Sequence, residues 1–142
     1  MIKQCHSRIP RTYVESLLLR LQKHFRKIRM LNRAIVQKQE LVLVFVNPQQ
    51  MKKMNTRYRG KKYVTDVLSF SSKDPQIFGE LVICLEKIRS QSKEHRMTFK
   101  QELAYMIIHG VLHLAGMDHE TSESDAKKMF ALQDRIFAEL DL

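Results

Sequence analysis

Three histidines, His109, His113 and His119, fall within one short segment of this chain, and imidazole nitrogens are common ligands of transition metals. The first two lie four positions apart, so on a helix their rings project from one face about 6 Å apart. Gly116 can adopt the left-handed conformation that ends a helix and turn the chain so that His119 returns to the same ion. The spacing therefore predicts one metal ion held by three neutral imidazoles, with a position open for water.

The expected ion is Zn²⁺, although nitrogen-only ligands also suit nickel, copper or iron, so Ni²⁺ or another divalent ion is an alternative. Such an ion lowers the pKa of a bound water toward about 7, which supplies hydroxide at neutral pH. We expect that hydroxide to attack a phosphodiester. Histidines on a buried helix also occur as hydrogen-bonded core residues, but the glycine and the third histidine favour a metal site.

Two other functions fit the same residues. The spacing His-x3-His-x2-Gly-x2-His is that of the metzincin peptidases, whose general base is a glutamate beside the first histidine. This chain has Gly110 there, which moves no proton. The second alternative is a non-catalytic rRNA- or ribosome-binding assembly factor, in which the metal only stabilises the loop after the helix. Such a structural site is closed by a fourth protein ligand. The other three histidines and both cysteines lie outside the motif, so the sequence offers no obvious fourth ligand.

A second group of residues could bind and activate a phosphate. Arg59 presents paired donors to phosphate oxygens and stays charged at any working pH, and Lys61 and Lys62 follow as further RNA-binding candidates. We expect Arg59 to brace the phosphate as negative charge builds in the transition state. Asp118 and Glu120 flank the third histidine, and either one could accept the proton or orient an imidazole.

The positive charge is concentrated in the N-terminal part of the chain. Residues 1–62 hold sixteen Lys or Arg against two acids, a net +14, whereas residues 63–142 hold nine against thirteen, a net −4. This asymmetry indicates a surface that meets phosphates, and the alternative is a basic face that is merely solvated.

Both segments resemble the YbeY family of bacterial endoribonucleases. The family signature H-G-x-L-H-L-x-G-x-D-H is met in full by residues 109–119. Its upstream pattern, L-N-x-x-Y-R followed by T-D-V-L-S-F, is met by residues 55–59 and 65–70, with Met54 replacing the leucine. The chain departs from the family at Ser71, where proline is usual, and at Gly79-Glu80-Leu81, where Gly-Asp-Ile is usual.

The resemblance implies a zinc ion on the three histidines, with His113 and Arg59 as catalytic residues. It also implies a single-strand-type endoribonuclease that matures ribosomal RNA, notably the 3′ end of the small-subunit species, in ribosome biogenesis. The implied partners are ribosomal RNA and the small ribosomal subunit or its assembly factors, with no DNA and no membrane.

The elements that must position these residues follow from hydrophobic periodicity. Residues 11–29 predict one amphipathic helix, whose apolar stripe packs on a core or, alternatively, lies on a membrane. Residues 41–46 are typical of a buried strand, and Pro48 begins a short helix toward Tyr58 that Gly60 ends. Residues 64–70 and 80–85 are two further strand candidates.

The helix that carries the histidines is predicted from Thr98, which forms a capping box with Gln101, to about Ala115. It is apolar almost all round, so it is the buried central helix, and Glu102 on its first turns is expected to be structural. A last helix begins after Ser122, which caps it with Asp125.

These elements predict an α+β fold, in which residues 1–142 form a single domain. We expect a small mixed sheet of about four strands with packed helices, one of them a metzincin-like helix that carries the metal ligands. No apolar run reaches the ~20 residues of a membrane span, and the first residues lack the apolar core of a secretory signal. With only two cysteines in no metal-binding pattern, we expect a cytoplasmic protein.

Overall fold

The computed structural model describes residues 2–4 and 10–142, and its centre is a four-stranded sheet. The strands are β1 (Ile2–Gln4), β2 (Glu40–Phe45), β3 (Val67–Ser71) and β4 (Ile77–Ile83), in the order β1-β2-β4-β3. The first three in that order run parallel, and β3 is antiparallel to β4. The predicted α+β class with a small mixed sheet is confirmed.

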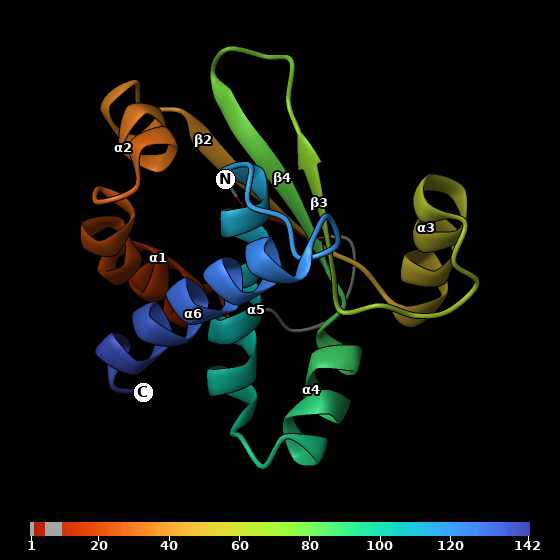
Figure 1. Cartoon of the computed structure of the whole chain (residues 1–142). Coiled ribbons are helices and arrows are strands. Elements are labelled where there is room, and N and C mark those ends of the chain that lie inside the picture. The colour runs from red at the N-terminus through yellow and green to blue at the C-terminus, as the bar shows by residue number, and fades with distance from the viewer. Residues whose placement is uncertain (1, 5–9) are drawn as a thin grey trace.

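Six helices pack around this sheet within the described residues: α1 (Arg11–Phe25), α2 (Arg29–Val36), α3 (Pro48–Arg59), α4 (Leu85–Glu94), α5 (Phe99–Leu114) and α6 (Glu123–Leu140). In Figure 1 the strands separate α3, at the right, from α1, α5 and α6. None of these helices combines the length and the apolar character that crossing a membrane requires.

Alternation along the strands divides the buried side chains between two clusters. Leu43, Phe45, Leu81 and Ile83 belong to the main core, which also holds the buried apolar side chains of α1, α5 and α6. The alternate positions, among them Val82 and Leu68, belong to a smaller cluster with Met51 of α3. Burial on both faces explains why β2 is apolar almost throughout.

The predicted helix ends near the site are confirmed. Thr98 Oγ1 accepts a hydrogen bond from the Gln101 amide at 3.1 Å, and Gln101 Oε1 accepts one from the Thr98 amide at 2.9 Å. Asn47 forms a similar box at the start of α3, which ends at Gly60 in the left-handed conformation. The Ser122 hydroxyl accepts from the Asp125 amide at the start of α6.

The prediction of one helix over residues 11–29 was wrong, because α1 ends at Phe25 and α2 begins at Arg29. Hydrogen bonds from Lys27 to His24 and from Ile28 to Phe25 tighten the chain into a turn, and Ile28 is extended. Ile28 still packs against the main core. A periodicity of apolar residues therefore continued across a break in the backbone.

The two strands next to the site were predicted a few residues out of place. The strand expected at residues 64–70 begins only at Val67, because the Asp66 carboxylate accepts a hydrogen bond from the Val67 amide at 2.7 Å. The strand expected at residues 80–85 is Ile77–Ile83, and Leu85 already begins α4, which the sequence did not predict. Only Leu85, Ile88 and Ser92 of α4 are buried, so its apolar pattern is too sparse to predict a helix.

Candidate metal centre

The end of α5 brings the three histidines together. Gly116 has φ +91°, the amide of Gly116 bonds the carbonyl of His113 at 2.9 Å, and the amide of Met117 bonds that of Leu112 at 3.1 Å. This pair of bonds is a Schellman motif, which reverses the chain after the helix. The ring centroids of His109, His113 and His119 are consequently 4.7 to 5.2 Å apart.

The donor set fits a metal ion. One nitrogen from each ring can be chosen so that all three lie within 4.8 Å of one another. Nε2 of His113 and Nδ1 of His119 are 3.0 Å apart, close to the roughly 3.4 Å between two ligands of a tetrahedral zinc ion with bonds of ~2.0–2.1 Å. These three histidines could therefore hold an ion after small ring movements.

Gln133 of α6 fixes the orientation of one ring. Its Oε1 is 2.9 Å from Nδ1 of His109, and its Nε2 donates to the carbonyl of Tyr105 at 3.4 Å. Because the amide nitrogen is used there, Oε1 is the acceptor and His109 carries its proton on Nδ1. Nε2 of His109 is therefore left with a lone pair, as metal-ligating histidines require.

The surroundings favour the neutral form of two of these rings. Burial lowers the pKa of His109; the Gln133 hydrogen bond partly opposes this, and His119 adds to it. Burial also lowers the pKa of His113, followed by the effects of the other two imidazoles. Neutral imidazole is the form that binds metal, so both rings remain available as ligands at mildly acidic pH.

Gly110 lies where α5 meets the sheet, and this contact explains why no glutamate follows His109. A Cβ at Gly110 would come within 2.7 Å of Leu81 Cδ2, and the Ser69 hydroxyl donates to the Gly110 carbonyl at 3.3 Å. A larger side chain would have to enter the fully buried side of α5. The base of the metzincin peptidases therefore has no counterpart at this position.

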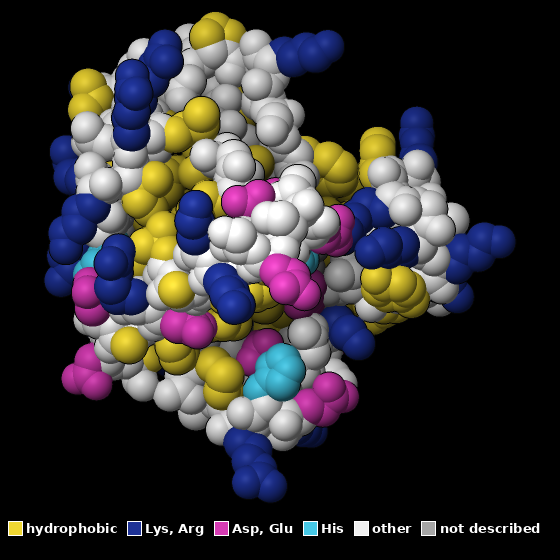
Figure 2. Space-filling model, viewed as in Figure 1, with side chains coloured by type: hydrophobic (Ala, Val, Ile, Leu, Met, Phe, Trp, Pro, Cys, Tyr) yellow, Lys and Arg dark blue, Asp and Glu magenta, His cyan; other side chains and the backbone are white. Residues whose placement is uncertain are grey.

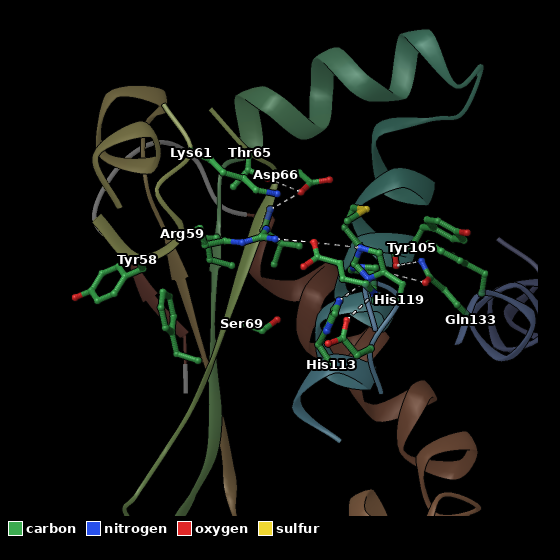
Figure 3. Close-up of a pocket in the computed structure, with 18 of the residues that line it drawn as sticks. Tyr58, Arg59, Lys61, Thr65, Asp66, Ser69, Tyr105, His113, His119 and Gln133 are labelled. Atoms are coloured by element: carbon green, nitrogen blue, oxygen red, sulfur yellow. Dashed lines mark hydrogen bonds and ion pairs between the residues drawn. The ribbon is translucent and has the colours of Figure 1, made fainter. Parts of the chain in front are cut away.

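Arg59 approaches the histidines from the side opposite Gln133 (Figure 3) and there contacts Glu120. Nη2 of Arg59 is 2.8 Å from Oε1 of Glu120, which is itself 3.9 Å from Nε2 of His119. Figure 3 shows Arg59 extending toward His119 and His113, whereas Tyr58 points away from them. The side chains of Arg59 and Glu120 are 36% and 55% exposed, so a ligand can reach both.

One pocket of about 680 Å³ connects these groups, and it is lined by the three histidines, Arg59, Lys61, Asp118 and Glu120, among others. Lys62, a predicted RNA-binding residue, is exposed and is not among the lining residues. Asp118 Oδ1 accepts from the Glu120 amide at 2.8 Å, and this bond is the main reason that the pKa of Asp118 is lowered. Asp118 thus supports the loop that presents Glu120.

Other lining residues were not predicted as part of a site. Gln133 is buried on α6 beside Met129 and Ile136, and a lone amide among apolar residues was the available signal. Tyr105 donates to Asp134 at 2.7 Å; burial first, and then that bond, raise its pKa, so it cannot serve as a base at neutral pH. Asp66 is held by three donors and shapes the start of β3.

Glu102 was expected to be structural, and its surroundings agree. Its carboxylate is completely buried and lies 3.0 Å from Nδ1 of His95. It is not among the residues that line the pocket. A buried carboxylate needs such a partner, and this one joins α5 to the segment after α4.

The fold and the convergent histidines define an α+β protein with a three-histidine cluster, at the end of a central helix, that could hold a metal ion. The family model described as Endoribonuclease YbeY matches residues 3–141. The chain belongs to the YbeY endoribonuclease family, which confirms the resemblance seen in the motifs and supports RNA as the substrate class.

Individual relatives agree with this membership. A protein of Bdellovibrio bacteriovorus named Endoribonuclease YbeY is 47% identical over 128 residues, which are 90% of this chain and 85% of the relative. One of Petrotoga mobilis with the same name is 43% identical over 102 residues, 71% of each chain. The solution structure of TM1509 from Thermotoga maritima has a TM-score of 0.66 at 29% identity, covering 98% of this chain and 88% of that one.

Proposed function

We propose that this protein is a metal-dependent endoribonuclease that hydrolyses phosphodiester bonds in single-stranded segments of ribosomal RNA. The observation that carries the proposal is the placement of the three histidines and Arg59 around one open pocket. His109, His113 and His119 would hold the ion, for which zinc suits an all-imidazole set. When bound, the ion acts as a Lewis acid that lowers the pKa of water and polarises phosphoryl oxygens.

The protein side chains bind and orient the substrate. Arg59 pairs with the non-bridging oxygens of the scissile phosphate and balances the charge that develops there. The phosphate takes the place that the Glu120 carboxylate occupies on Arg59 in this structure. Glu120, whose Oε1 lies 3.9 Å from Nε2 of His119, is then free to accept a proton from water.

The open side of the cluster supports catalysis over a structural metal. Within the described ranges, 2–4 and 10–142, the cluster contains three ligands and no fourth. Structural zinc sites are closed by four protein ligands, whereas catalytic sites keep one position for water or substrate. The peptidase alternative lacks its usual base, because Gly110 packs against Leu81.

We further propose that the RNA is the small-subunit ribosomal species, cut during maturation of its 3′ end in the cytoplasm, with the small subunit or its assembly factors as partners. Family membership supports this assignment, and so does the net +14 of residues 1–62. We treat residues 1–142 as a single domain, in agreement with a family match over residues 3–141.

The test is RNA cleavage by purified protein with measured metal content. His113→Ala and Arg59→Ala should each lower the rate at least about 100-fold, the loss typical for removing a group that stabilises transition-state charge. Lys73→Ala is the matched control, because it removes an exposed charge outside the pocket, and it should retain most activity. If both site variants cut RNA as fast as the parent, the assignment fails and a contaminating nuclease explains the cleavage.

A further inference from the structure

Helix α3 presents a basic face that the proposed catalytic residues do not use. Lys52, Lys53 and Arg57 are all exposed, and together with Gln49 and Thr56 they line a second hollow on the protein surface. None of the three cations forms an ion pair with a carboxylate among the described residues. Figure 2 shows Lys and Arg side chains gathered on the part of the molecule that α3 forms, at the right.

The composition of α3 is unusual for a surface helix that serves only solubility. It has no acidic residue between Pro48 and Arg59, although opposite charges one turn apart normally stabilise exposed helices. Its attachment to the molecule uses Met51 and Asn55, the two buried residues, on its inner side. The three unpaired cations therefore repel one another, and they take no part in the packing of α3. A polyanion is the ligand that would relieve this repulsion.

Tyr58 lies between this basic face and the metal pocket. Its side chain is 55% exposed, and its ring packs edge-on against Phe70 with a centroid distance of 5.1 Å. The guanidinium of Arg57 lies 5.4 Å from the same ring. A half-exposed aromatic ring next to a cation is an arrangement on which unpaired nucleobases stack.

The basic face is continuous with the site, because Tyr58 lines the same pocket as the three histidines and precedes Arg59 in the last turn of α3. An RNA strand whose scissile phosphate binds Arg59 would therefore contact the Tyr58 ring with its neighbouring nucleotide and the cations of α3 with the nucleotides beyond it. An acidic peptide would also satisfy the cations, but it would gain nothing specific from the half-exposed ring. The combination of both features favours single-stranded RNA.

We infer that Lys52, Lys53, Arg57 and Tyr58, the α3 track, bind the RNA segment that flanks the cleaved bond. The three cations pair with successive phosphates, and the Tyr58 ring stacks against an unpaired base. This inference rests on the proposed function, since it places the flanking RNA relative to Arg59 and the histidines. It adds a binding subsite for a nucleobase that lies outside the metal centre.

The electrostatic part is tested by RNA binding at several salt concentrations, with His113→Ala present in every protein to prevent cleavage. The triple variant K52Q/K53Q/R57Q should reduce the slope of log K against log salt by about 2, because each phosphate contact on a single strand contributes about 0.7. The matched control K23Q/R26Q/K27Q removes the same charge from exposed positions at the end of α1. Equal losses in both variants would overturn the α3 track, since they would indicate a general charge effect.

The stacking part is tested with a fluorescent adenine analogue in an RNA of about twelve nucleotides, within the range that single-strand binding surfaces cover. Tyr58→Leu should weaken binding about tenfold and remove the quenching of the analogue, whereas Tyr58→Phe should retain both. A trinucleotide that reaches only Arg59 should bind all variants alike. Unchanged binding by Tyr58→Leu, with melting temperatures equal to the parent, would overturn the base subsite.

Cleavage by the metal-loaded parent is measured separately, so that the two proposals can fail independently. If the parent does not cut RNA but the α3 variants still lose affinity, the nuclease assignment falls and the α3 track stands. If the parent cuts RNA and the α3 variants bind like the parent, only the α3 track falls.

Discussion

The roles proposed for Arg59 and Glu120 depend on one contact between their side chains. Their ion pair of 2.8 Å joins α3 to the loop after α5, across 61 residues of sequence. Both side chains are partly exposed, so the pair contributes about 0–1 kcal/mol to stability. A contact this weak can be replaced by a phosphate, which offers Arg59 a better bidentate partner.

Glu120→Gln should therefore bind RNA a few-fold more tightly than the parent, the size of effect that an exposed ion pair supports. It should also cut more slowly, because the proposed proton acceptor is lost. Asp118→Asn is the control, since it removes the same charge nearby and its Oδ1 can still accept the Glu120 amide. Affinity is measured by fluorescence anisotropy, and an equal gain in both variants would contradict a specific role for the Arg59–Glu120 contact.

Gln133 determines which nitrogen of His109 would be available to a metal ion. Gln133→Leu should lower metal affinity about 10–100-fold, the usual cost of removing a group that orients a ligating imidazole. Gln133→Glu preserves an acceptor at the same place and should retain most of the affinity. Competition with a chromophoric chelator measures both, and unchanged affinity in Gln133→Leu would show that packing alone holds the ring.

At the scale of the elements, the position of His119 depends on one residue at the end of α5. Gly116 has φ +91°, and a Cβ there would meet no atom within 4 Å, so a side chain would cause backbone strain without a clash. Gly60, at the end of α3, has φ +67° and is equally free of neighbours. The two glycines thus end their helices in the same conformation, but only Gly116 is followed by a predicted metal ligand, His119.

Gly116→Ala and Gly60→Ala should each lower the free energy of unfolding by about 1–2 kcal/mol, the cost of the left-handed conformation for an L-residue. Only Gly116→Ala should also weaken metal binding, because the strained turn moves His119. Urea unfolding of the metal-free proteins and metal titration separate the two effects. A similar loss of metal affinity in Gly60→Ala would mean that the site responds to global stability.

For the whole molecule, the buried imidazoles make the stability of the metal-free protein depend on pH. The pKa values of His109 and His113 are lowered from 6.5 in the folded state, with burial as the largest cause. The unfolded chain therefore binds more protons than the folded chain once the pH falls below about 6.5. The stability contributed by the neutral rings is present above that pH and is lost as the pH falls toward the lowered values.

The free energy of unfolding in the presence of chelator should accordingly decrease between pH 7.5 and pH 5.5. The double variant His109→Asn, His113→Asn should show a shallower decrease, which isolates these rings from the other histidines. Denaturant unfolding followed by circular dichroism provides the measurement. Parallel pH profiles for the parent and the variant would show that protonation of these two imidazoles does not lower the free energy of unfolding.

The sequence by itself determined the features that depend on neighbouring residues. The rings of His109 and His113 share a helix face because of the 3.6-residue repeat, and Gly116 turns the chain because it lacks a Cβ. The capping box at Thr98 is local in the same way. These are properties of one backbone segment, so their spacing along the chain was sufficient to predict them.

Only the tertiary structure decided which distant groups meet these residues. It placed Glu120 on Arg59 and Gln133 on His109, and it placed α5 against the sheet at Gly110. It also divided the first predicted helix into two. Such contacts depend on how the sheet and helices pack as whole bodies, and no window of sequence contains both partners, so periodicity and spacing could not reveal them.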